Sequence, residues 1–276
     1  MKNSFSVLMS IYVNDDVGFL REAFESLVKQ SVLFEELVVV CDGEITDEQE
    51  SVLADYEKKF ALLSIAYKNP RLKINQGLGN ALNFGSGFCT QKYIVRMDSD
   101  DISTIDRIEK LTAVISQYPN ADVVGALIEE FNSNPGDLGI KRVVPEGTAS
   151  IFNYSKIRNP MNHVTACIKK DSLDRVGGDE NVLWHEDYYL WIKMLRLGME
   201  LRNVHDVHVF VRVGELGGRR NGIKYLRSEF NFLKRCLSIG HFSLLNTISY
   251  MLPRLSVRLM PAGVTAYIYK FLRSAK

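Results

Sequence analysis

Three carboxylates in four consecutive positions are the sharpest chemical feature of the sequence. They are Asp98, Asp100 and Asp101, directly after the apolar run at 93–95. Two carboxylates about 5 Å apart repel by roughly 3 kcal/mol at an effective dielectric constant of 20. In a crevice such a cluster favours a divalent cation, and oxygen ligands suit Mg²⁺ or Mn²⁺, which also bind phosphates. The alternative is an Asp-rich turn that caps a helix starting near Asp106.

Polar residues also follow two earlier apolar runs. Tyr12 ends the first run, where its ring could stack on a nucleobase, and Asp42 follows Val40 and Cys41. The Asp42 carboxylate could accept hydrogen bonds from a nucleobase N–H or a ribose hydroxyl. The alternatives are an ordinary Asp-Gly turn at Asp42 and a tyrosine that is only packed.

A glycine-rich segment from Asn75 to Gly85 is expected to open a helix, where backbone N–H groups can face an anion. Gly77 and Gly79 are followed three residues later by Leu82, so the segment does not match the dinucleotide-binding fingerprint. The sequence contains no Walker motif either. The sequence therefore does not favour a hydride-transferring dehydrogenase or a P-loop nucleotide hydrolase.

An acidic pair, Glu186 and Asp187, begins a helical pattern later in the chain. On a helix, Asp187 shares the packed stripe with Trp191 and Gly198, while Glu186 turns away from it. Asp187 could act as a general base toward a hydroxyl, a role that contributes about 10² to 10⁴ in rate. The alternative is a first-turn acid that interacts with the helix dipole, which contributes about 0.3 to 1 kcal/mol. His163 could contact an acceptor or be structural.

The elements that position these residues alternate along the first hundred positions. Strands are expected at 5–12, 36–41, 63–67 and 92–97, and helices at 17–29, 46–60 and 78–88. The runs at 38–40 and 93–95 are continuously apolar, as in strands covered on both faces. This pattern predicts a parallel α/β sheet, and in such sheets ligands bind beyond the carboxyl ends of the strands.

The pattern changes after residue 101. Helices are expected at 106–118 and 187–197, and strands at 123–126, 141–144, 164–169 and 204–213. The stretch 132–137 is rich in Asn, Ser, Pro and Gly and is expected to turn at the surface.

Composition and charge exclude several classes of protein. The 276 residues are 46% hydrophobic and 24% charged, which is typical of a globular protein. With 34 basic and 33 acidic residues the net charge is +1, so no strong field indicates a nucleic-acid partner. Charge is sorted along the chain, however: residues 219–276 hold 11 Lys or Arg and one acid, Glu229, which gives +10 and leaves −9 for residues 1–218.

The basic tail favours a surface role. From residue 242 onward it reads as two amphipathic pieces interrupted by Pro253 and Pro261. Its longest uncharged run, 236–253, is too polar to span a bilayer, so we expect the tail to lie on a membrane or to dock elsewhere. Near an anionic membrane each Lys or Arg contributes about 1 kcal/mol. The basic stripe that would do so comprises Arg254, Arg258, Lys270 and Arg273. The alternative is a helix packed on the rest of the protein.

The four cysteines indicate the compartment. They lie 48, 78 and 69 positions apart, and this spacing matches neither a zinc site nor a compact disulfide framework. The apolar run near the start lacks the cleavage site of a signal peptide. We therefore expect reduced thiols in a protein either free in the cytoplasm or peripheral on the inner face of the cytoplasmic membrane.

Taken together, these residues resemble the inverting, GT-A type, family 2 glycosyltransferases of bacterial polysaccharide biosynthesis. The resemblance extends from about residue 6 to about residue 213. Its pieces are the strand that ends in Tyr12, the strand that ends in Asp42, the 75–85 segment, the Asp98-Ser99-Asp100 "DXD" element, Gly177-Gly178 and Glu186-Asp187. One departure is Ile11: the sequence has Ser10-Ile11-Tyr12-Val13 where the family usually has Pro-Thr-Tyr-Asn, so the threonine hydroxyl that contacts the base in the family is absent.

The resemblance implies transfer of a sugar from a nucleoside diphosphate donor, most often UDP-linked, to an acceptor hydroxyl with inversion. It implies the following roles: Tyr12, Asp42 and Asn75 hold the nucleotide sugar, Asp98 touches the ribose or the metal, Asp100 ligates Mn²⁺ or Mg²⁺, and Asp187 deprotonates the acceptor. Arg219 and Arg220 would close over the diphosphate, or belong to a solvated basic loop.

The resemblance also implies a domain organisation. Residues 1–218 would form a GT-A catalytic domain, with a nucleotide-binding half at about 1–101 and an acceptor-binding half at about 102–218. Residues 219–276 would form a basic, amphipathic helical extension. The implied acceptor is a saccharide, often lipid-linked. Two other functions stay open: a nucleotidyltransferase, and a non-catalytic subunit that binds a sugar nucleotide.

Overall fold

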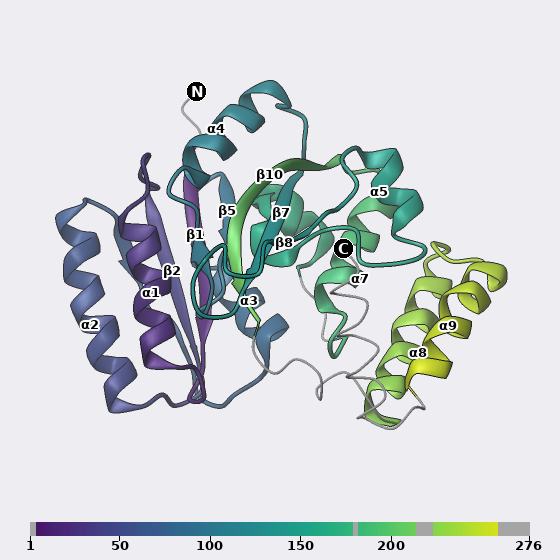
Figure 1. The fold of residues 1–276 in the computed structure, drawn as a ribbon, viewed down its shortest axis with the longest axis horizontal. Helices are drawn as coiled ribbons and strands as arrows, with labels where there is room; N and C mark the ends of the chain where they lie inside the picture. Colours follow the sequence, from purple (N-terminus) through teal and green to yellow (C-terminus); the bar gives the residue numbers. More distant parts are fainter. Residues whose placement is uncertain (1–3, 179–181, 214–222, 259–276) are drawn as a thin grey trace.

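A ten-stranded sheet flanked by helices organises the computed structural model, which describes residues 4–178, 182–213 and 223–258 (Figure 1). The strand order is β3-β2-β1-β5-β9-β7-β10-β6, with β4 beside β2 and β8 beside β7. The strands are β1 (Phe5–Ile11), β2 (Glu36–Asp42), β3 (Ala66–Lys68), β4 (Arg71–Leu72), β5 (Tyr93–Arg96), β6 (Ile102–Ser103), β7 (Val123–Phe131), β8 (Ile140–Arg142), β9 (Cys167–Lys169) and β10 (Leu201–Arg212).

Helices cover both faces of the sheet. They are α1 (Val17–Val28), α2 (Asp47–Leu62), α3 (Leu78–Ser86), α4 (Arg107–Gln117), α5 (Thr148–Tyr154), α6 (Lys170–Val176), α7 (Glu186–Arg196), α8 (Ile223–Ser238) and α9 (Leu244–Arg258). Because successive strand residues point to opposite faces, Val7 and Met9 pack against α1 and α2, while Leu8 packs with α3. Burial on both faces explains the continuously apolar strands.

The parallel part of the sheet brings three strand ends to one edge. β1 pairs in parallel with β2 and with β5, so Ile11, Asp42 and Arg96 end their strands on the same side. β7 and β10 are also parallel, whereas β9 runs antiparallel to both β5 and β7. The predicted α/β class, with a mostly parallel central sheet between helices, is confirmed.

Several elements differ from the sequence-based prediction. The single strand expected at 164–169 is a 3₁₀ turn, η1 (His163–Thr165), followed by β9, and β7 continues well beyond residue 126. The helices α5 and α6 were not anticipated. Each has seven residues, too few for a clear hydrophobic period, and tertiary packing through Ile151 and Leu173 stabilises them.

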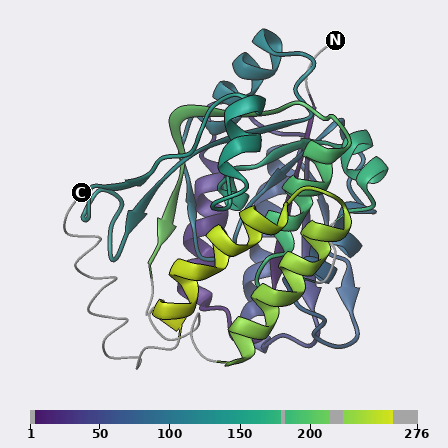
Figure 2. The ribbon, with the colours of Figure 1, turned by 90° about the vertical axis from the view of Figure 1, so that its right-hand side faces the viewer.

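The C-terminal part of the described chain is a helical hairpin. α8 and α9 lie side by side at one end of the molecule (Figures 1 and 2). They share a hydrophobic cluster with α7 in which Phe232 and Tyr250 contact Tyr188. The expected interruption at Pro253 is wrong, because α9 continues through it. Proline removes one backbone hydrogen bond, and here burial of Tyr250 and Met251 holds the helix together. α8 begins before residue 242, within the C-terminal extension that is expected to be helical.

Two further sequence-based expectations concern thiols and membranes. All four cysteines are free and buried, and burial raises the pKa of Cys89, Cys167 and Cys236 to about 12. Among the described residues, no helix combines the length and apolar character needed to cross a bilayer.

Candidate active site

The loop after β5 holds the three clustered carboxylates in different environments. Arg96 is buried and its guanidinium pairs with the Asp98 carboxylate. Asp100 is exposed, whereas Asp101 is buried and accepts the backbone N–H of Arg212 at 2.9 Å. The alternative reading of this cluster as the N-cap of the next helix finds no support, since Asp106 precedes α4 without a side-chain capping bond.

A fourth carboxylate, Asp15, joins the loops after β1 and β5. One of its oxygens, Oδ2, accepts the Ser99 hydroxyl at 2.9 Å and the Tyr12 backbone N–H at 3.1 Å. Gln49 on α2 supports the same turn, because its amide donates to the carbonyls of Tyr12 and Asp15. Tyr12 and the Asp98–Asp101 loop are thereby brought together, as the sequence predicts.

Desolvation and the proximity of several carboxylates determine the electrostatics of this edge. Burial raises the pKa of Asp15 to about 6, opposed by its hydrogen bonds and assisted by the charges of Asp100 and Asp98. Desolvation within the crowded loop and the neighbouring carboxylates also raise the pKa of the exposed Asp100 and of the buried Asp101. Each of these groups ionises more readily when a cation is near.

Arg107, a buried arginine, supports the start of the acidic loop through hydrogen bonds to backbone carbonyls. Arg107 is fully enclosed, and burial lowers its pKa to about 10. Its Nη2 donates to the carbonyls of Arg96 at 2.8 Å and Val164 at 2.9 Å. Arg107 therefore ties the end of β5 to the turn that carries His163.

The carboxylate oxygens of the acidic loop are suitable ligands for a hard cation, but they are too few to complete its coordination alone. Carboxylate oxygens at Asp98 and Asp100 are the ligand type that Mg²⁺ and Mn²⁺ prefer, and the charge of Asp98 contributes to raising the pKa of Asp100. Across the part of the chain that is described, however, no group of three or more Asp, Glu, His or Cys side chains could hold a metal ion. Oxygens of a bound diphosphate would therefore have to complete the coordination, and metal binding at Asp98 and Asp100 stays a prediction.

Asp42 anchors the glycine-rich segment. It is 4% exposed, and its Oδ1 and Oδ2 accept the backbone N–H groups of Gln76 at 2.7 Å and Gly77 at 2.9 Å. Next to it, Gly43 has φ +89, and a Cβ there would lie 2.8 Å from the Asn75 nitrogen. The structure thus brings Asp42 and Asn75 together at the end of β2. Contact of Asp42 with a base stays a prediction that would use its remaining lone pairs.

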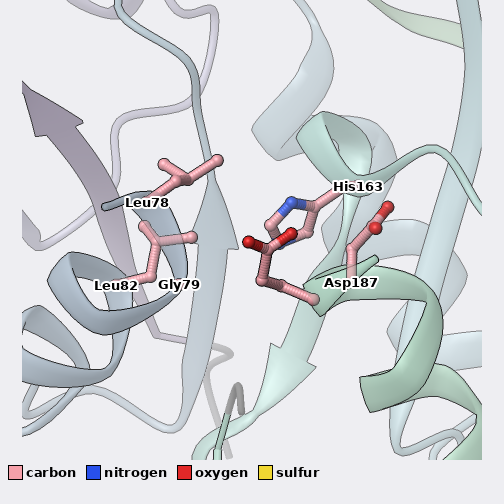
Figure 3. A pocket seen from close by; sticks show the side chains of 6 residues that line it. Leu78, Gly79, Leu82, His163 and Asp187 are labelled. Atoms are coloured by element: carbon pink, nitrogen blue, oxygen red, sulfur yellow. The ribbon is translucent and has the colours of Figure 1, made fainter. Parts of the chain in front are cut away.

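A cavity of about 170 Å³ separates the first turns of α3 and α7. Leu78, Gly79 and Leu82 line it from α3, and His163, Glu186 and Asp187 line it from the other side (Figure 3). Glu186, which the helical pattern turns away from the packed stripe, thus reaches the same cavity as Asp187.

The turn at Val176–Gly178 connects the two walls of this cavity, because it contacts both α3 and α7. Gly178 approaches α3 so closely that a Cβ would lie 2.1 Å from Asn83 Oδ1. Lys193 on α7 donates to the carbonyl of Gly178 at 2.9 Å and to that of Val176 at 3.2 Å. Gly178 has φ +69, a conformation that favours glycine, and a Cβ there would require the Asn83 side chain to shift.

Asp187 is held by a partner that sequence reasoning missed. Asn159 Nδ2 donates to Asp187 Oδ2 at 2.6 Å. The next residue of α7, Tyr188, donates its hydroxyl to the Ser155 carbonyl at 2.7 Å. The segment from Ser155 to Asn159 therefore fixes the start of α7.

The C-terminal hairpin in turn holds that segment. The Ser155 hydroxyl donates to the Phe152 carbonyl at 2.7 Å, so His241 must donate through Nε2–H to Ser155 Oγ at 2.8 Å. Burial lowers the pKa of His241 to about 4, so the ring is neutral at pH 7. Arg254 of α9 donates to the Ile157 carbonyl at 2.8 Å. The inner side of α8 and α9 therefore packs on the rest of the protein, as one of the two alternatives for the tail expects.

Comparison with known proteins decides what kind of enzyme carries this site. Residues 6–176 match the family model described as glycosyl transferase family 2. The chain belongs to glycosyl transferase family 2. The resemblance seen in the sequence is thereby confirmed, and the protein is a glycosyltransferase.

Curated family 2 relatives match along nearly the whole chain. An uncharacterized glycosyltransferase of Haemophilus influenzae is 38% identical over 271 residues, covering 98% of this chain and 99% of its own. The UDP-Gal:alpha-D-GlcNAc-diphosphoundecaprenol beta-1,3-galactosyltransferase of Escherichia coli is 38% identical over 267 residues, covering 96% and 95%. An amylovoran biosynthesis glycosyltransferase of Erwinia amylovora is 32% identical, covering 96% and 98%.

Solved structures confirm the GT-A fold of this family 2 glycosyltransferase. Residues 1–349 of Staphylococcus aureus TarS in complex with UDP-GlcNAc superpose with a TM-score of 0.64 at 18% identity, covering 88% of this chain and 69% of that one. A Pyrobaculum calidifontis mannosyltransferase in complex with GDP-Man and Mn²⁺ superposes with a TM-score of 0.59 at 15% identity, covering 99% and 81%.

Sequence reasoning about this glycosyltransferase missed Asp15 and Asn159. Asp15 is visible in a run of three polar residues that reads as an ordinary loop, and nothing around Asn159 in the sequence signals its partner. Arg219, Arg220, Lys270 and Arg273 lie outside the described residues.

We expect Asp15→Asn to stabilise the glycosyltransferase above pH 6 while weakening donor binding. The folded-state pKa of Asp15, about 6, exceeds the ordinary aspartate value of 3.8, so the free energy of unfolding of the wild type falls as pH rises between these values and stays low above them. Removing the charge should recover about 1 to 3 kcal/mol at pH 7.5 and little at pH 4. Urea unfolding at both pH values measures this difference, and equal effects at the two would contradict the assigned environment.

We expect Asn159→Ala to lower kcat about tenfold and leave the donor Kd unchanged, because it removes a hydrogen bond to a carboxylate that is worth about 1.5 to 3 kcal/mol. Asn153→Ala, an exposed site on α5 just before this segment, is the control. Wild-type kcat in Asn159→Ala would show that Asn159 does not act through Asp187.

Proposed function

We propose that this glycosyltransferase moves a sugar from a UDP-sugar to a hydroxyl of a lipid-linked saccharide in bacterial polysaccharide assembly, with inversion at the anomeric carbon. Two comparisons support the choice of substrates. The Escherichia coli relative is named for UDP-Gal and for an acceptor attached to diphosphoundecaprenol, and it matches 96% of this chain. The TarS structure contains UDP-GlcNAc.

On this proposal the residues at the strand ends bind the donor. Tyr12 and Asp42 contact the base, and Asn75, held beside Asp42, contacts the nucleotide sugar. Asp98 and Asp100 are the residues that would hold Mn²⁺ or Mg²⁺. When bound, the cation would neutralise the charge that develops on the leaving diphosphate.

The acceptor side of the proposal relies on one observation: Asp187 lines the cavity between α3 and α7 while Asn159 holds one of its oxygens. A carboxylate fixed in this way can take the proton of an acceptor hydroxyl as the oxygen attacks the anomeric carbon. A base on the side opposite the leaving diphosphate gives inversion. His163 lies on the same cavity wall, where it could contact the acceptor.

The location follows from the proposed acceptor. A lipid-linked saccharide keeps the enzyme at a membrane, so we place the protein in the cytoplasm with peripheral attachment to the inner face of the cytoplasmic membrane. The basic C-terminal segment is the proposed attachment, and no nucleic-acid partner is proposed.

A panel of donors tests the proposal. UDP-Gal, UDP-GlcNAc, UDP-Glc, GDP-Man and dTDP-Glc are each added with and without Mn²⁺, and the melting temperature is recorded. We expect a UDP-sugar with Mn²⁺ to raise Tm most. The preferred donor is then incubated with a synthetic GlcNAc-diphosphate-lipid, and the released product is identified.

The products separate the three candidate functions. Release of UDP that depends on the acceptor supports glycosyl transfer. Release of pyrophosphate from a sugar phosphate and UTP would favour a nucleotidyltransferase instead. Donor binding with no release of either product from any saccharide acceptor would favour a non-catalytic subunit.

A further inference from the structure

The outward side of α9 is an exposed apolar row. Leu244, Leu245, Ile248 and Leu252 are 73%, 77%, 59% and 69% exposed. Their spacing of three and four residues places them on one face of the helix, opposite the buried Tyr250. An apolar row of this kind on a surface helix marks an interaction site.

The exposed positions of α8, the helix beside it, carry positive charge, although Lys224 and Arg235 also lie over the rings of Trp184 and Tyr189. Lys224, Arg227, Lys234 and Arg235 are all exposed. Glu229 is the one acid of residues 219–276, and it is 1% exposed, with Arg254 3.8 Å from its carboxylate. Within the described part of the hairpin, every exposed charge is therefore positive.

We propose that the face formed by Leu244, Leu245, Ile248 and Leu252 with the basic row of α8 docks on an anionic lipid bilayer. Figure 2 shows the two helices side by side on one end of the molecule. Apolar side chains would enter the boundary between head groups and acyl chains while the cations remain at the head groups, as in amphipathic helices that lie in the membrane plane. This inference rests on the proposed function only in that the acceptor is lipid-linked.

Charge favours a bilayer over a second copy of the chain. A two-fold dimer through this face would bring the same patch of both subunits together and would place like charges against each other. An anionic bilayer supplies the opposite charge, and each Lys or Arg near its surface contributes about a fivefold factor in binding. Membrane docking is therefore favoured by both the apolar row of α9 and the basic row of α8. Self-association would be favoured by the apolar row but opposed by repulsion between the basic rows.

Docking would also fix the position of the candidate active site relative to the membrane. The inner side of the same hairpin contacts the segment that holds Asp187, through His241 to Ser155 and through Arg254 to Ile157. Both helices pack on α7, which carries Asp187 on its first turn. A membrane bound to the outer side would thus be linked through one rigid hairpin to the wall of the cavity.

Vesicle flotation of the full chain tests the proposal. The vesicles are phosphatidylcholine alone or phosphatidylcholine with 30% phosphatidylglycerol. Three proteins are compared: the wild type, an α9 variant (Leu245→Ser, Ile248→Ser, Leu252→Ser), and a matched control with serine at three exposed apolar sites elsewhere, Leu62, Ile74 and Ile105.

We expect the wild type and the control to float with the anionic vesicles, and the α9 variant to bind them at least tenfold more weakly. A second variant, Lys224→Gln with Arg227→Gln and Lys234→Gln, should lose the preference for phosphatidylglycerol by about a hundredfold. Wild-type chain that stays unbound, or an α9 variant that floats like the control, would overturn the proposal. So would a wild-type dimer in solution that the α9 variant abolishes while vesicle binding persists.

Turnover separates this proposal from the proposed function. Release of UDP is measured for the same variants with a short-chain, water-soluble acceptor. Normal release by an α9 variant that no longer floats supports docking as a separate role of this face. Vesicle binding by a wild type that transfers no sugar would leave docking supported and the proposed function refuted.

Discussion

Replacing Asp187 by asparagine is expected to lower kcat by about 10² to 10⁴, the contribution of a positioned general base. The amide is nearly isosteric with the carboxylate but cannot accept a proton from the acceptor hydroxyl. On the proposed function the donor would bind at the strand ends rather than through this side chain, so its Kd should change by less than about threefold. Kinetics with saturating donor and acceptor, together with calorimetry of donor binding, measure both quantities.

A matched control separates the chemistry from the helix dipole. Asp171 is an exposed acid in the first turn of α6, as Asp187 is in the first turn of α7. Asp171→Asn should cost at most about 1 kcal/mol of stability and leave kcat unaltered. If Asp187→Asn retains wild-type turnover, the first-turn acid is only structural and the assignment of the base fails.

Replacing Asp100 by alanine is expected to eliminate donor binding that depends on Mn²⁺, with a loss of at least about a hundredfold in the donor Kd, or roughly 3 kcal/mol. Asp100 is the exposed carboxylate of the acidic loop, so a cation that bridges the loop and a diphosphate would need it. Titration of UDP with the protein, with Mn²⁺ and with EDTA, measures the effect.

The same substitution should stabilise the apoprotein. The charge of Asp100 helps to raise the pKa of both Asp15 and Asp101, so its removal relieves repulsion in the folded state. Asp206→Ala, at an exposed acid on β10, is the control for a simple change in net charge. Mn²⁺-dependent donor binding that survives in Asp100→Ala would count decisively against the metal site.

The residues at the strand ends could be predicted because topology determines their position. Tyr12, Asp42 and Asp98 each follow an apolar run, and parallel pairing of β1 with β2 and β5 brings the ends of those runs to one edge. The helical period likewise predicted α7 and the place of Asp187 on it. These are local patterns that a sequence carries on its own.

The supporting residues could not be predicted, because their partners are distant in the sequence. Ser99 lies 84 positions from Asp15, and Asp187 lies 28 positions from Asn159. A hydrogen bond between such residues has no local signature. The same holds for α9, where Pro253 predicts a break and the packing of Tyr250 on Tyr188 and Phe232 overrides it.

The burial of Cys41, Cys89, Cys167 and Cys236 makes this chain a ready host for site-directed labelling. Thiolates are the species that react with maleimides and nitroxide reagents, and a thiol with a pKa near 12 in the interior supplies almost none at neutral pH. A single cysteine introduced at Ile248 should therefore take up a fluorophore or spin label alone. Its emission or accessibility would then report the immersion depth of α9 with every native residue but one in place.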